Sequence, residues 1–255
     1  MRRAVLLTVV VVLLAGCSGG GGKGQATGTT RPQATITTGL PTTVPEPTTT
    51  TIPIPTFVVA TAQVPRVGVY SEPAAATAAR TLAHPNPTYG SPRNFLVTEE
   101  QGDWLNIYLP SRPNGSTGWI KKSDVSLSEH HFRILVELGQ FKMTVYDKND
   151  VVFEAPVGVG RSATPSTTGY FYTTELIAVV PDQRAAYGPF AYGLSAYSEV
   201  LYDFGGGDGQ MGIHGTGDPS SVGRSVSNGC IRMTNDAITH LRNLLPIGVP
   251  VEIRA

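Results

Sequence analysis

The sequence predicts a mostly β protein in which a small β-barrel module precedes a larger β-rich domain that has one main helix near its C-terminus. Three observations predict this fold class. Apolar and polar residues alternate with a period of two in several short segments, which is typical of half-buried strands. The chain contains 29 Gly and 20 Pro among 255 residues, and these residues divide it into short pieces. Only one segment, near the C-terminus, has apolar residues at helical spacing.

The overall composition excludes one class of partner. Lys plus Arg and Asp plus Glu both number 19, so the formal net charge is zero. Nucleic-acid binding requires clustered positive charge, and we therefore expect no nucleic-acid partner. Charged residues make up only 15% of the chain, but aromatic residues at 8% suffice for a core, so the chain is not wholly disordered.

Residues 1–16 have the pattern of a signal peptide. A basic start, Met1–Arg3, precedes an apolar run that is too short to span a bilayer of about 30 Å. The run ends in Leu-Ala-Gly followed by Cys17, which resembles the bacterial lipobox, in which this Cys is acylated. We therefore expect a lipoprotein anchored to the extracytoplasmic face of the cell membrane; the alternative is an ordinary secreted protein.

Residues 17–57 are predicted to be the lipidated Cys and a disordered tether. Positions 18–57 include 13 Thr, 7 Gly and 6 Pro, a composition that cannot bury enough apolar surface to offset the ordering entropy. A fully extended tether of this length reaches about 130 Å, at roughly 3.3 Å per residue.

Residues 58–128 are predicted to form the small β module. Leu105 and Ile107 alternate with polar neighbours, and Asn114-Gly115 is a strong hairpin signal. The segment 102–125 resembles a bacterial Src-homology-three-like barrel. Its aromatic residues either line a groove for peptide or glycan or serve only in packing; they are Trp104, Tyr108 and Trp119.

Residues 129–255 are predicted to form the larger domain. Strands are expected from the alternation at Ile134–Leu138 and Met143–Val145, with a turn at Lys148–Asp150. A Thr/Pro-rich loop over residues 163–168 enters another strand, and the last six residues read as a strand. The main helix begins after Thr234, which has N-cap chemistry, and ends before Pro246.

The candidate chemistry lies in residues 211–234. If Cys17 is acylated, Cys230 is the only thiol of an exported protein and has no disulfide partner. A free Cys is often only a small buried hydrophobe, but Cys230 follows the polar turn Ser227–Gly229, and a Gly before the Cys can aim backbone amides at one point. His214 is the natural base, because imidazole contact can lower a thiol pKa of about 8.5 and give a thiolate–imidazolium pair.

Other sites are weaker interpretations. One His and one Cys leave a zinc site short of ligands, so we expect no metal. A thiol–disulfide exchanger would need a CxxC motif, which is absent. His240, on the predicted helix, is expected to be solvent-exposed or capping.

Residues 213–216 (IHGT) and 228–233 (NGCIRM) resemble the signature of the L,D-transpeptidase family, which has a YkuD-type catalytic domain. The resemblance covers roughly residues 131–254. It implies a cysteine-dependent acyltransferase that uses no cofactor, acts on peptidoglycan stem peptides and forms 3–3 cross-links in cell wall biosynthesis. Carbapenem-type β-lactams are the expected inhibitors.

The resemblance also implies roles for individual residues. Cys230 would be the nucleophile, and His214 would donate and accept the proton. The Gly215 carbonyl would orient the imidazole, and the amides of Gly229 and Cys230 would form the oxyanion hole. The remaining predicted residues would bind substrate, and they are Ser227, Asn228 and Arg232.

Asn228 departs from the family pattern, which usually has His at this position. An amide still donates and accepts hydrogen bonds but does not ionise. The alternative function is therefore a non-catalytic peptidoglycan-binding lipoprotein with a degenerate transpeptidase domain. A papain-like endopeptidase is disfavoured because in that class the Cys precedes the His.

Overall fold

The structure, a computed structural model, describes residues 53–203 and 207–255. The predicted signal peptide, the predicted lipidation site Cys17 and the tether before residue 53 lie outside the described residues. No helix in the described ranges is both long enough and apolar enough to cross a membrane.

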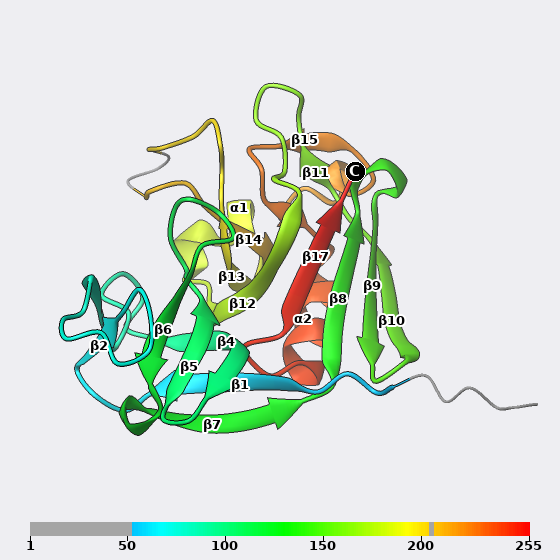
Figure 1. Cartoon of the computed structure of the whole chain (residues 1–255). Helices are drawn as coiled ribbons and strands as arrows, with labels where there is room; N and C mark the ends of the chain where they lie inside the picture. Colours follow the sequence, from blue (N-terminus) through cyan, green and yellow to red (C-terminus); the bar gives the residue numbers. More distant parts are fainter. Residues whose placement is uncertain (1–52, 204–206) are drawn as a thin grey trace, which may run out of the picture. The chain divides into compact units, whose positions relative to one another are not determined.

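The first part of the described chain is an antiparallel sheet of five strands, in the order β6-β5-β4-β1-β7 (Figure 1). A two-stranded hairpin, β2 with β3, accompanies it. We call residues 57–130 the N-terminal module. Its strands are β1 (Phe57–Ala62), β2 (Arg66–Val69), β3 (Arg80–Ala83), β4 (Asn94–Gln101), β5 (Trp104–Tyr108), β6 (Thr117–Lys121) and β7 (Val125–His130).

The core of the N-terminal module follows the predicted alternation. On β5, Leu105 and Ile107 are fully buried while the residues beside them are half-buried. Strands β5 and β6 form the predicted antiparallel pair, and Gly115 in their connection has a φ of +75°, which favours glycine. The predicted division at residue 128 stays a prediction.

The second part is an eight-stranded sheet, here called the large sheet, in the order β10-β9-β8-β17-β12-β13-β14-β16. The pairs β8/β17 and β14/β16 are parallel, and the other neighbours are antiparallel. Its strands are β8 (Phe132–Glu137), β9 (Lys142–Asp147), β10 (Asp150–Pro156), β12 (Gly169–Ala178), β13 (Phe190–Tyr197), β14 (Gln210–His214), β16 (Ile231–Arg232) and β17 (Pro250–Arg254). A separate parallel pair joins β11 (Val159–Gly160) to β15 (Ser225–Ser227).

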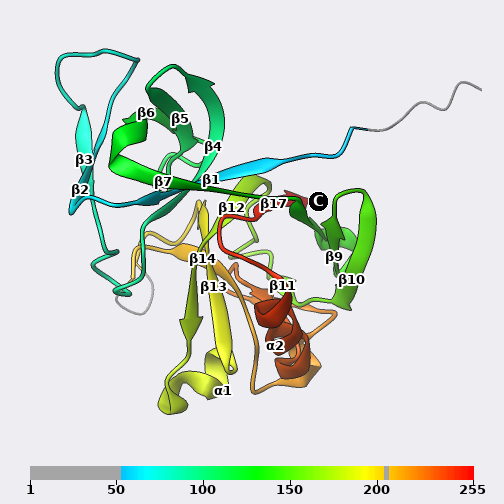
Figure 2. The ribbon, with the colours of Figure 1, turned by 90° about the horizontal axis from the view of Figure 1, so that it is seen from below.

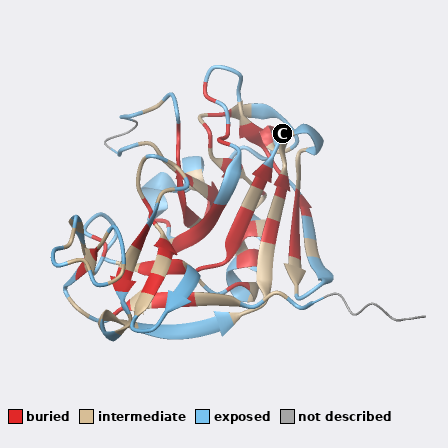
Figure 3. Ribbon diagram, viewed as in Figure 1, coloured by how far each residue is buried: buried red, intermediate tan, exposed pale blue. Residues whose placement is uncertain are grey.

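The main helix, α2 (Asn235–Leu244), lies where the sequence predicts it, and it packs against the large sheet (Figures 1 and 2). The Thr234 hydroxyl accepts a hydrogen bond from the Ala237 amide at 3.2 Å and so caps the helix. Ile238 and Leu241 are fully buried in the core beside the strands. Buried positions are concentrated on the middle strands of the large sheet (Figure 3).

The remaining helical segments are short. The helix α1 (Arg184–Tyr187) was not predicted, because one turn carries no periodicity that a sequence pattern could reveal. Leu138, predicted to continue a strand, instead begins a 3₁₀ turn, since β8 ends at Glu137. The described part of the chain also contains the 3₁₀ turns η1 (Lys122–Asp124), η2 (Leu138–Gln140), η3 (Pro181–Gln183) and η4 (Pro219–Ser221). The prediction of a mostly β fold with one main helix is confirmed.

Polar groups join the N-terminal module to the large sheet. The buried Tyr172 hydroxyl donates to the Asn94 carbonyl at 3.2 Å, and the Tyr197 hydroxyl donates to the Pro110 carbonyl at 2.9 Å. The Asn114 side chain donates to the Tyr197 carbonyl at 2.8 Å and accepts from the Tyr197 amide at 2.9 Å. The two sheets therefore share hydrogen bonds that satisfy buried polar atoms of both.

Candidate active site

His214 is the last residue of β14, and its side chain is buried at 3% exposure. Its Nδ1 lies 2.6 Å from the Gly215 carbonyl oxygen. Because a carbonyl only accepts, Nδ1 carries the proton in this contact, and Nε2 is left with the lone pair. The imidazole is therefore held in the tautomer that a base acting through Nε2 requires.

Two residues that the sequence analysis did not single out support His214. The Tyr187 ring, on α1, meets the imidazole edge-on with ring centroids 5.0 Å apart. At the start of α2, the Asn235 Oδ1 accepts from the Thr216 amide at 3.0 Å and so holds the loop that follows His214. No sequence pattern pointed to Tyr187, whereas Asn235 directly follows the predicted N-cap residue Thr234 but was given no role at the site.

The turn before Cys230 is built around the Ser227 hydroxyl. Ser227 Oγ donates to the Cys230 carbonyl at 2.7 Å and accepts from the Gly229 amide at 3.1 Å. Gly229 has a φ of +119°, where a side chain would be strained, so glycine permits the tight turn.

These contacts differ from two predicted roles. Ser227 is 1% exposed and its hydroxyl is used within the turn, so it shapes the turn instead of contacting substrate. The Gly229 amide is already bound to Ser227 and is not free to hold an oxyanion in this arrangement. The Cys230 amide, which has no hydrogen-bond partner among the described residues, is the remaining predicted donor.

A loop over residues 161–168 holds the turn Ser227–Gly229 through hydrogen bonds. The Ser166 hydroxyl donates to the Gly229 carbonyl at 2.7 Å, and the Thr164 hydroxyl donates to the Ser227 carbonyl at 3.1 Å. The Gly160 amide in turn donates to Ser166 Oγ at 2.9 Å. The predicted Thr/Pro loop is therefore also a support of the turn that carries Cys230.

Cys230 lies directly before β16, which pairs with the end of β14 and places Arg232 opposite His214. Cys230 is a free cysteine and is partly exposed. Burial raises the pKa of its thiol, and a backbone hydrogen bond from Gly212 and the charge of Arg232 oppose that rise. The neighbouring strands bring the predicted nucleophile and base to the same edge of the large sheet, although no hydrogen bond joins the two side chains in the described structure.

The ionisation of this pair differs from the prediction of a thiolate–imidazolium pair. Burial lowers the pKa of His214 to about 4, with the Arg232 charge acting in the same direction and the hydrogen bond to Gly215 opposing it. Since the pKa of Cys230 is raised, both groups are neutral at neutral pH. The resting site is a thiol beside a neutral imidazole, because its surroundings disfavour the charged form of each group.

Arg232 lies close enough to affect both groups, and its Nε is buried without a hydrogen-bond partner among residues 53–203 and 207–255. Such an unused donor is costly unless an anionic or carbonyl group binds it. The neighbouring Asn228, which replaces the usual His, is partly exposed.

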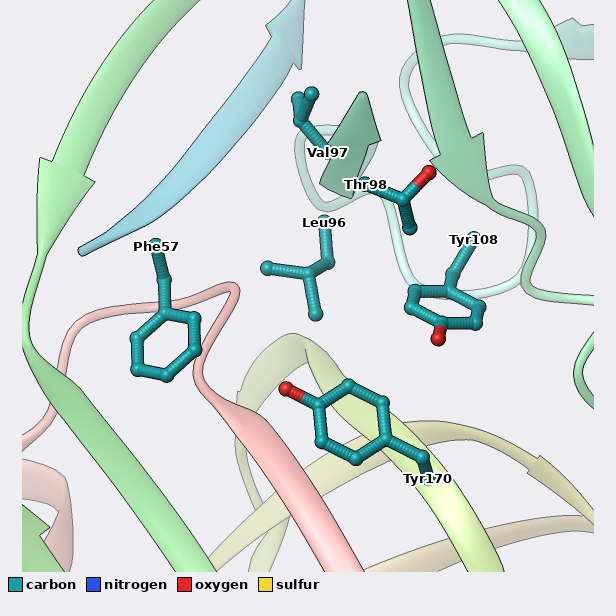
Figure 4. Close-up of a pocket in the computed structure, with 6 residues that line it drawn as sticks. All are labelled: Phe57, Leu96, Val97, Thr98, Tyr108 and Tyr170. Atoms are coloured by element: carbon teal, nitrogen blue, oxygen red, sulfur yellow. The ribbon is translucent and has the colours of Figure 1, made fainter. Parts of the chain in front are cut away.

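The predicted aromatic groove takes a different form. Trp104 packs edge-on against Tyr70 at 4.9 Å, whereas Tyr108 lines an open cavity of about 310 Å³ together with Tyr170 (Figure 4). Trp104 and Trp119 are not among the residues that line this cavity, so the three aromatic residues do not form one groove there.

His240, on the surface of α2, is exposed, as the sequence predicts, and its ring stacks on the Phe153 ring with centroids 4.9 Å apart.

Comparison with known proteins finds similarity in the part of the chain that contains this edge of the large sheet. The family model for the L,D-transpeptidase catalytic domain, YkuD, matches residues 131–253. The putative L,D-transpeptidase YkuD of Bacillus subtilis is 36% identical over 123 residues, which are 48% of this chain and 65% of that protein. The probable L,D-transpeptidase ErfK/SrfK of Escherichia coli is 27% identical over 183 residues, covering 65% of this chain and 56% of that protein.

Among solved structures, L,D-transpeptidase 3 from Mycobacterium tuberculosis, in complex with a faropenem-derived adduct, is 14% identical with a TM-score of 0.40. The similarity covers 57% of this chain and 76% of that one. The chain thus spans slightly less than two thirds of the curated Bacillus relative, and the match lies in the part that contains His214 and Cys230. Residues 131–253 are therefore similar to the L,D-transpeptidase catalytic domain of the YkuD family.

Proposed function

We propose that the chain is an L,D-transpeptidase that forms 3–3 cross-links in peptidoglycan through a thioester on Cys230. The observation that carries the proposal is the His214 ring, whose Nδ1 is fixed on the Gly215 carbonyl at 2.6 Å. Its lone-pair nitrogen is thereby available at the strand edge where Cys230 lies. A buried, oriented base beside a free thiol on a tight glycine turn suits acyl transfer.

In the first step, the Cys230 sulfur attacks the carbonyl of the third stem residue, a diamino acid. His214 Nε2 takes the thiol proton during the attack, because both groups start neutral. The amide bond to the terminal D-alanine breaks, and the imidazolium returns the proton to the leaving amine. A thioester and free D-alanine result.

In the second step, a side-chain amine from a neighbouring stem attacks the thioester. A new amide bond forms, the carbon–sulfur bond breaks, and the proton from the amine returns to the thiol through His214. Water in place of the amine would release the free acid, so the same site could act as a carboxypeptidase.

Two groups are suited to stabilise charge in these steps. The Cys230 amide has no other partner among the described residues and would donate to the developing oxyanion. The unpaired Nε of Arg232 would bind a carbonyl or carboxylate group of the stem peptide.

Intact-mass analysis after exposure to a carbapenem tests the proposal. The strained β-lactam carbonyl should acylate Cys230 and add one equivalent of mass. The adduct should disappear in Cys230→Ala, persist in Cys17→Ser, and form at least about a hundredfold more slowly in His214→Ala, which lacks the base. A wild-type protein that stays unmodified would instead favour the non-catalytic peptidoglycan-binding lipoprotein.

A second measurement tests the cross-link itself. Incubation with disaccharide tetrapeptides should release D-alanine and give dimers whose fragment masses identify a bond between two diamino acids. Monomeric tripeptides alone would identify hydrolysis and would contradict the cross-linking reaction.

We further propose that the protein is lipid-anchored at the extracytoplasmic face of the membrane through Cys17. The lipobox-like run before Cys17 supports this location. Labelling of expressing bacteria with an alkynyl fatty acid should mark the wild-type chain and not Cys17→Ser. Equal labelling of both chains would contradict acylation at this position.

A further inference from the structure

A loop of the N-terminal module is tied to the strand that carries His214. The loop connects β3 to β4, and its residue Asn86 is 7% exposed. Asn86 Nδ2 donates to Oε2 of Glu175, a residue of β12 that is 3% exposed, at 3.1 Å. The other carboxylate oxygen accepts from Nε2 of Gln210, the first residue of β14, at 3.0 Å. Glu175 therefore links the loop to β14 through two hydrogen bonds.

The loop is also fixed internally, over the turn Asn86–Gly90. Asn86 Oδ1 accepts from the Thr88 amide at 3.0 Å, and the Asn86 carbonyl accepts from the Gly90 amide at 2.7 Å. Gly90 has a φ of +67°, and the Asn86 amide donates to the Ser91 carbonyl at 2.8 Å. Tyr89 is thus carried on a turn whose ends and centre are hydrogen-bonded, which limits its positions.

The surroundings of Tyr89 include the active site. Its side chain is 45% exposed, so part of the ring is covered by the protein. Burial raises the pKa of the Tyr89 phenol, and the charges of Glu175, of Asp208 and of Cys230 when it is ionised raise it further. The Tyr187 phenol, whose ring contacts His214, also acts on it. Geometry places the loop at the same point: the Glu175 carboxylate that binds Asn86 lies against Gly193, and Gly193 pairs with Gly212 on β14. The Gly212 backbone is hydrogen-bonded to the Cys230 thiol, so the turn that carries Tyr89 is attached beside the strand positions that adjoin Cys230.

We propose that the Asn86–Gly90 turn forms part of the wall of the Cys230 site, and that Tyr89 contacts the acyl-donor peptide bound there. The identity of the donor, a peptidoglycan stem peptide, rests on the proposed function. A phenol suits such a contact, because its ring covers apolar stem atoms while its hydroxyl can bond a peptide group. The N-terminal module would then help to determine which donor reaches the thiol.

The first test measures access to the thiol and does not depend on the reaction catalysed. The full chain carrying Cys17→Ser has Cys230 as its one remaining thiol. Labelling rates with iodoacetamide, which is small, and with fluorescein maleimide, which is bulky, are compared in Tyr89→Ala, Tyr89→Phe and Tyr146→Ala. Tyr146 is the matched control, because it is a tyrosine on β9, which is separated from β14 and β16 in the large sheet. Its ring packs against Arg133.

We expect Tyr89→Ala to raise the maleimide rate about threefold to tenfold while leaving the iodoacetamide rate nearly unchanged. Tyr89→Phe, which keeps the ring, and Tyr146→Ala should resemble the parent chain. Equal maleimide rates in all four chains would overturn the placement of Tyr89 in the wall.

The second test measures single-turnover acylation of Cys230 by a disaccharide tetrapeptide. Tyr89→Ala should lower the acylation efficiency about threefold to tenfold. Asn86→Ala should do the same, because the turn loses its bond to Glu175. If Asn86→Ala fails to fold, Tyr89→Ala still tests the donor contact, because Tyr89 is half-exposed and its removal should not unfold the chain.

The two tests separate the two proposals. A parent chain that labels as expected but is never acylated by the peptide would refute the proposed function and leave the wall in place. Normal acylation of Tyr89→Ala would overturn the donor contact, whatever the labelling shows.

Discussion

At the scale of single residues, the site depends on how burial sets the charge of His214 and Cys230. Burial lowers the pKa of the imidazole to about 4 and raises that of the thiol, so neither group is charged at neutral pH. A preformed ion pair would place two charges in a poorly solvated site. In the proposed reaction, proton transfer during the attack would avoid that cost, and His214 would act as a general base throughout.

The neutral pair predicts a specific pH dependence of thiol alkylation. In the Cys17→Ser chain, the rate with iodoacetamide should be low at pH 5 and rise about tenfold per pH unit, without a plateau, toward the raised pKa of Cys230, because only the thiolate reacts. His214→Gln should show the same profile. A fast plateau between pH 5 and 8 that is lost in His214→Gln would instead identify a thiolate–imidazolium pair.

His214 also predicts how stability depends on pH. Its pKa is about 4 in the fold against an ordinary value of 6.5, so between these values the unfolded chain binds a proton that the folded chain does not. Stability should therefore fall as pH falls from 6.5 toward 4, by about 2 kcal/mol at pH 5. Urea unfolding at pH 7.5 and pH 5 measures this loss, which His214→Gln should reduce. An equal loss in both chains would contradict the buried neutral imidazole.

At the scale of elements, the sequence predicts best where the signal is local. Thr234 precedes α2 and caps it, and the alternation around Leu105 appears as buried and half-buried positions on β5. The role of Ser227 was not predictable, because a Ser before a glycine turn could face either substrate or backbone. The single turn of α1, which brings Tyr187 to His214, has no sequence periodicity.

The start of α2 predicts a positional effect on catalysis. Asn235→Ala removes the acceptor for the Thr216 amide and so loosens the loop whose Gly215 carbonyl orients His214. We expect acylation by a carbapenem to slow about tenfold or more, as small displacements of catalytic groups do. Asn243→Ala, at the other end of the same helix, is the matched control and should react like the wild type. Equal rates for the two variants would show that the loop is held without Asn235.

At the scale of the whole described molecule, the decisive contacts join residues that are far apart in the sequence. Asn114 reaches Tyr197, and Asn86 reaches Glu175. No local sequence pattern indicates such pairs, so the sequence predicts two separate folded parts but not the contacts between them. Tyr172, on β12, depends on the N-terminal module for the acceptors of its hydroxyl, which are the carbonyls of Asn94 and Tyr108.

These shared bonds predict that the N-terminal module and the large sheet unfold together. Buried polar groups such as Glu175 and the Tyr197 phenol would lose partners if one part opened alone, at about 1–3 kcal/mol for each group. Calorimetry of the wild type should therefore give one transition, and Asn114→Ala should lower its midpoint by about 2–4 °C for each kcal/mol lost. Asn106→Ala removes a side chain that accepts a hydrogen bond from Thr98 within the module; it is the control and should shift the midpoint less. Two resolved transitions, with only the first moved by Asn114→Ala, would mean that the parts are stable independently and that the bonds between them are not needed by either.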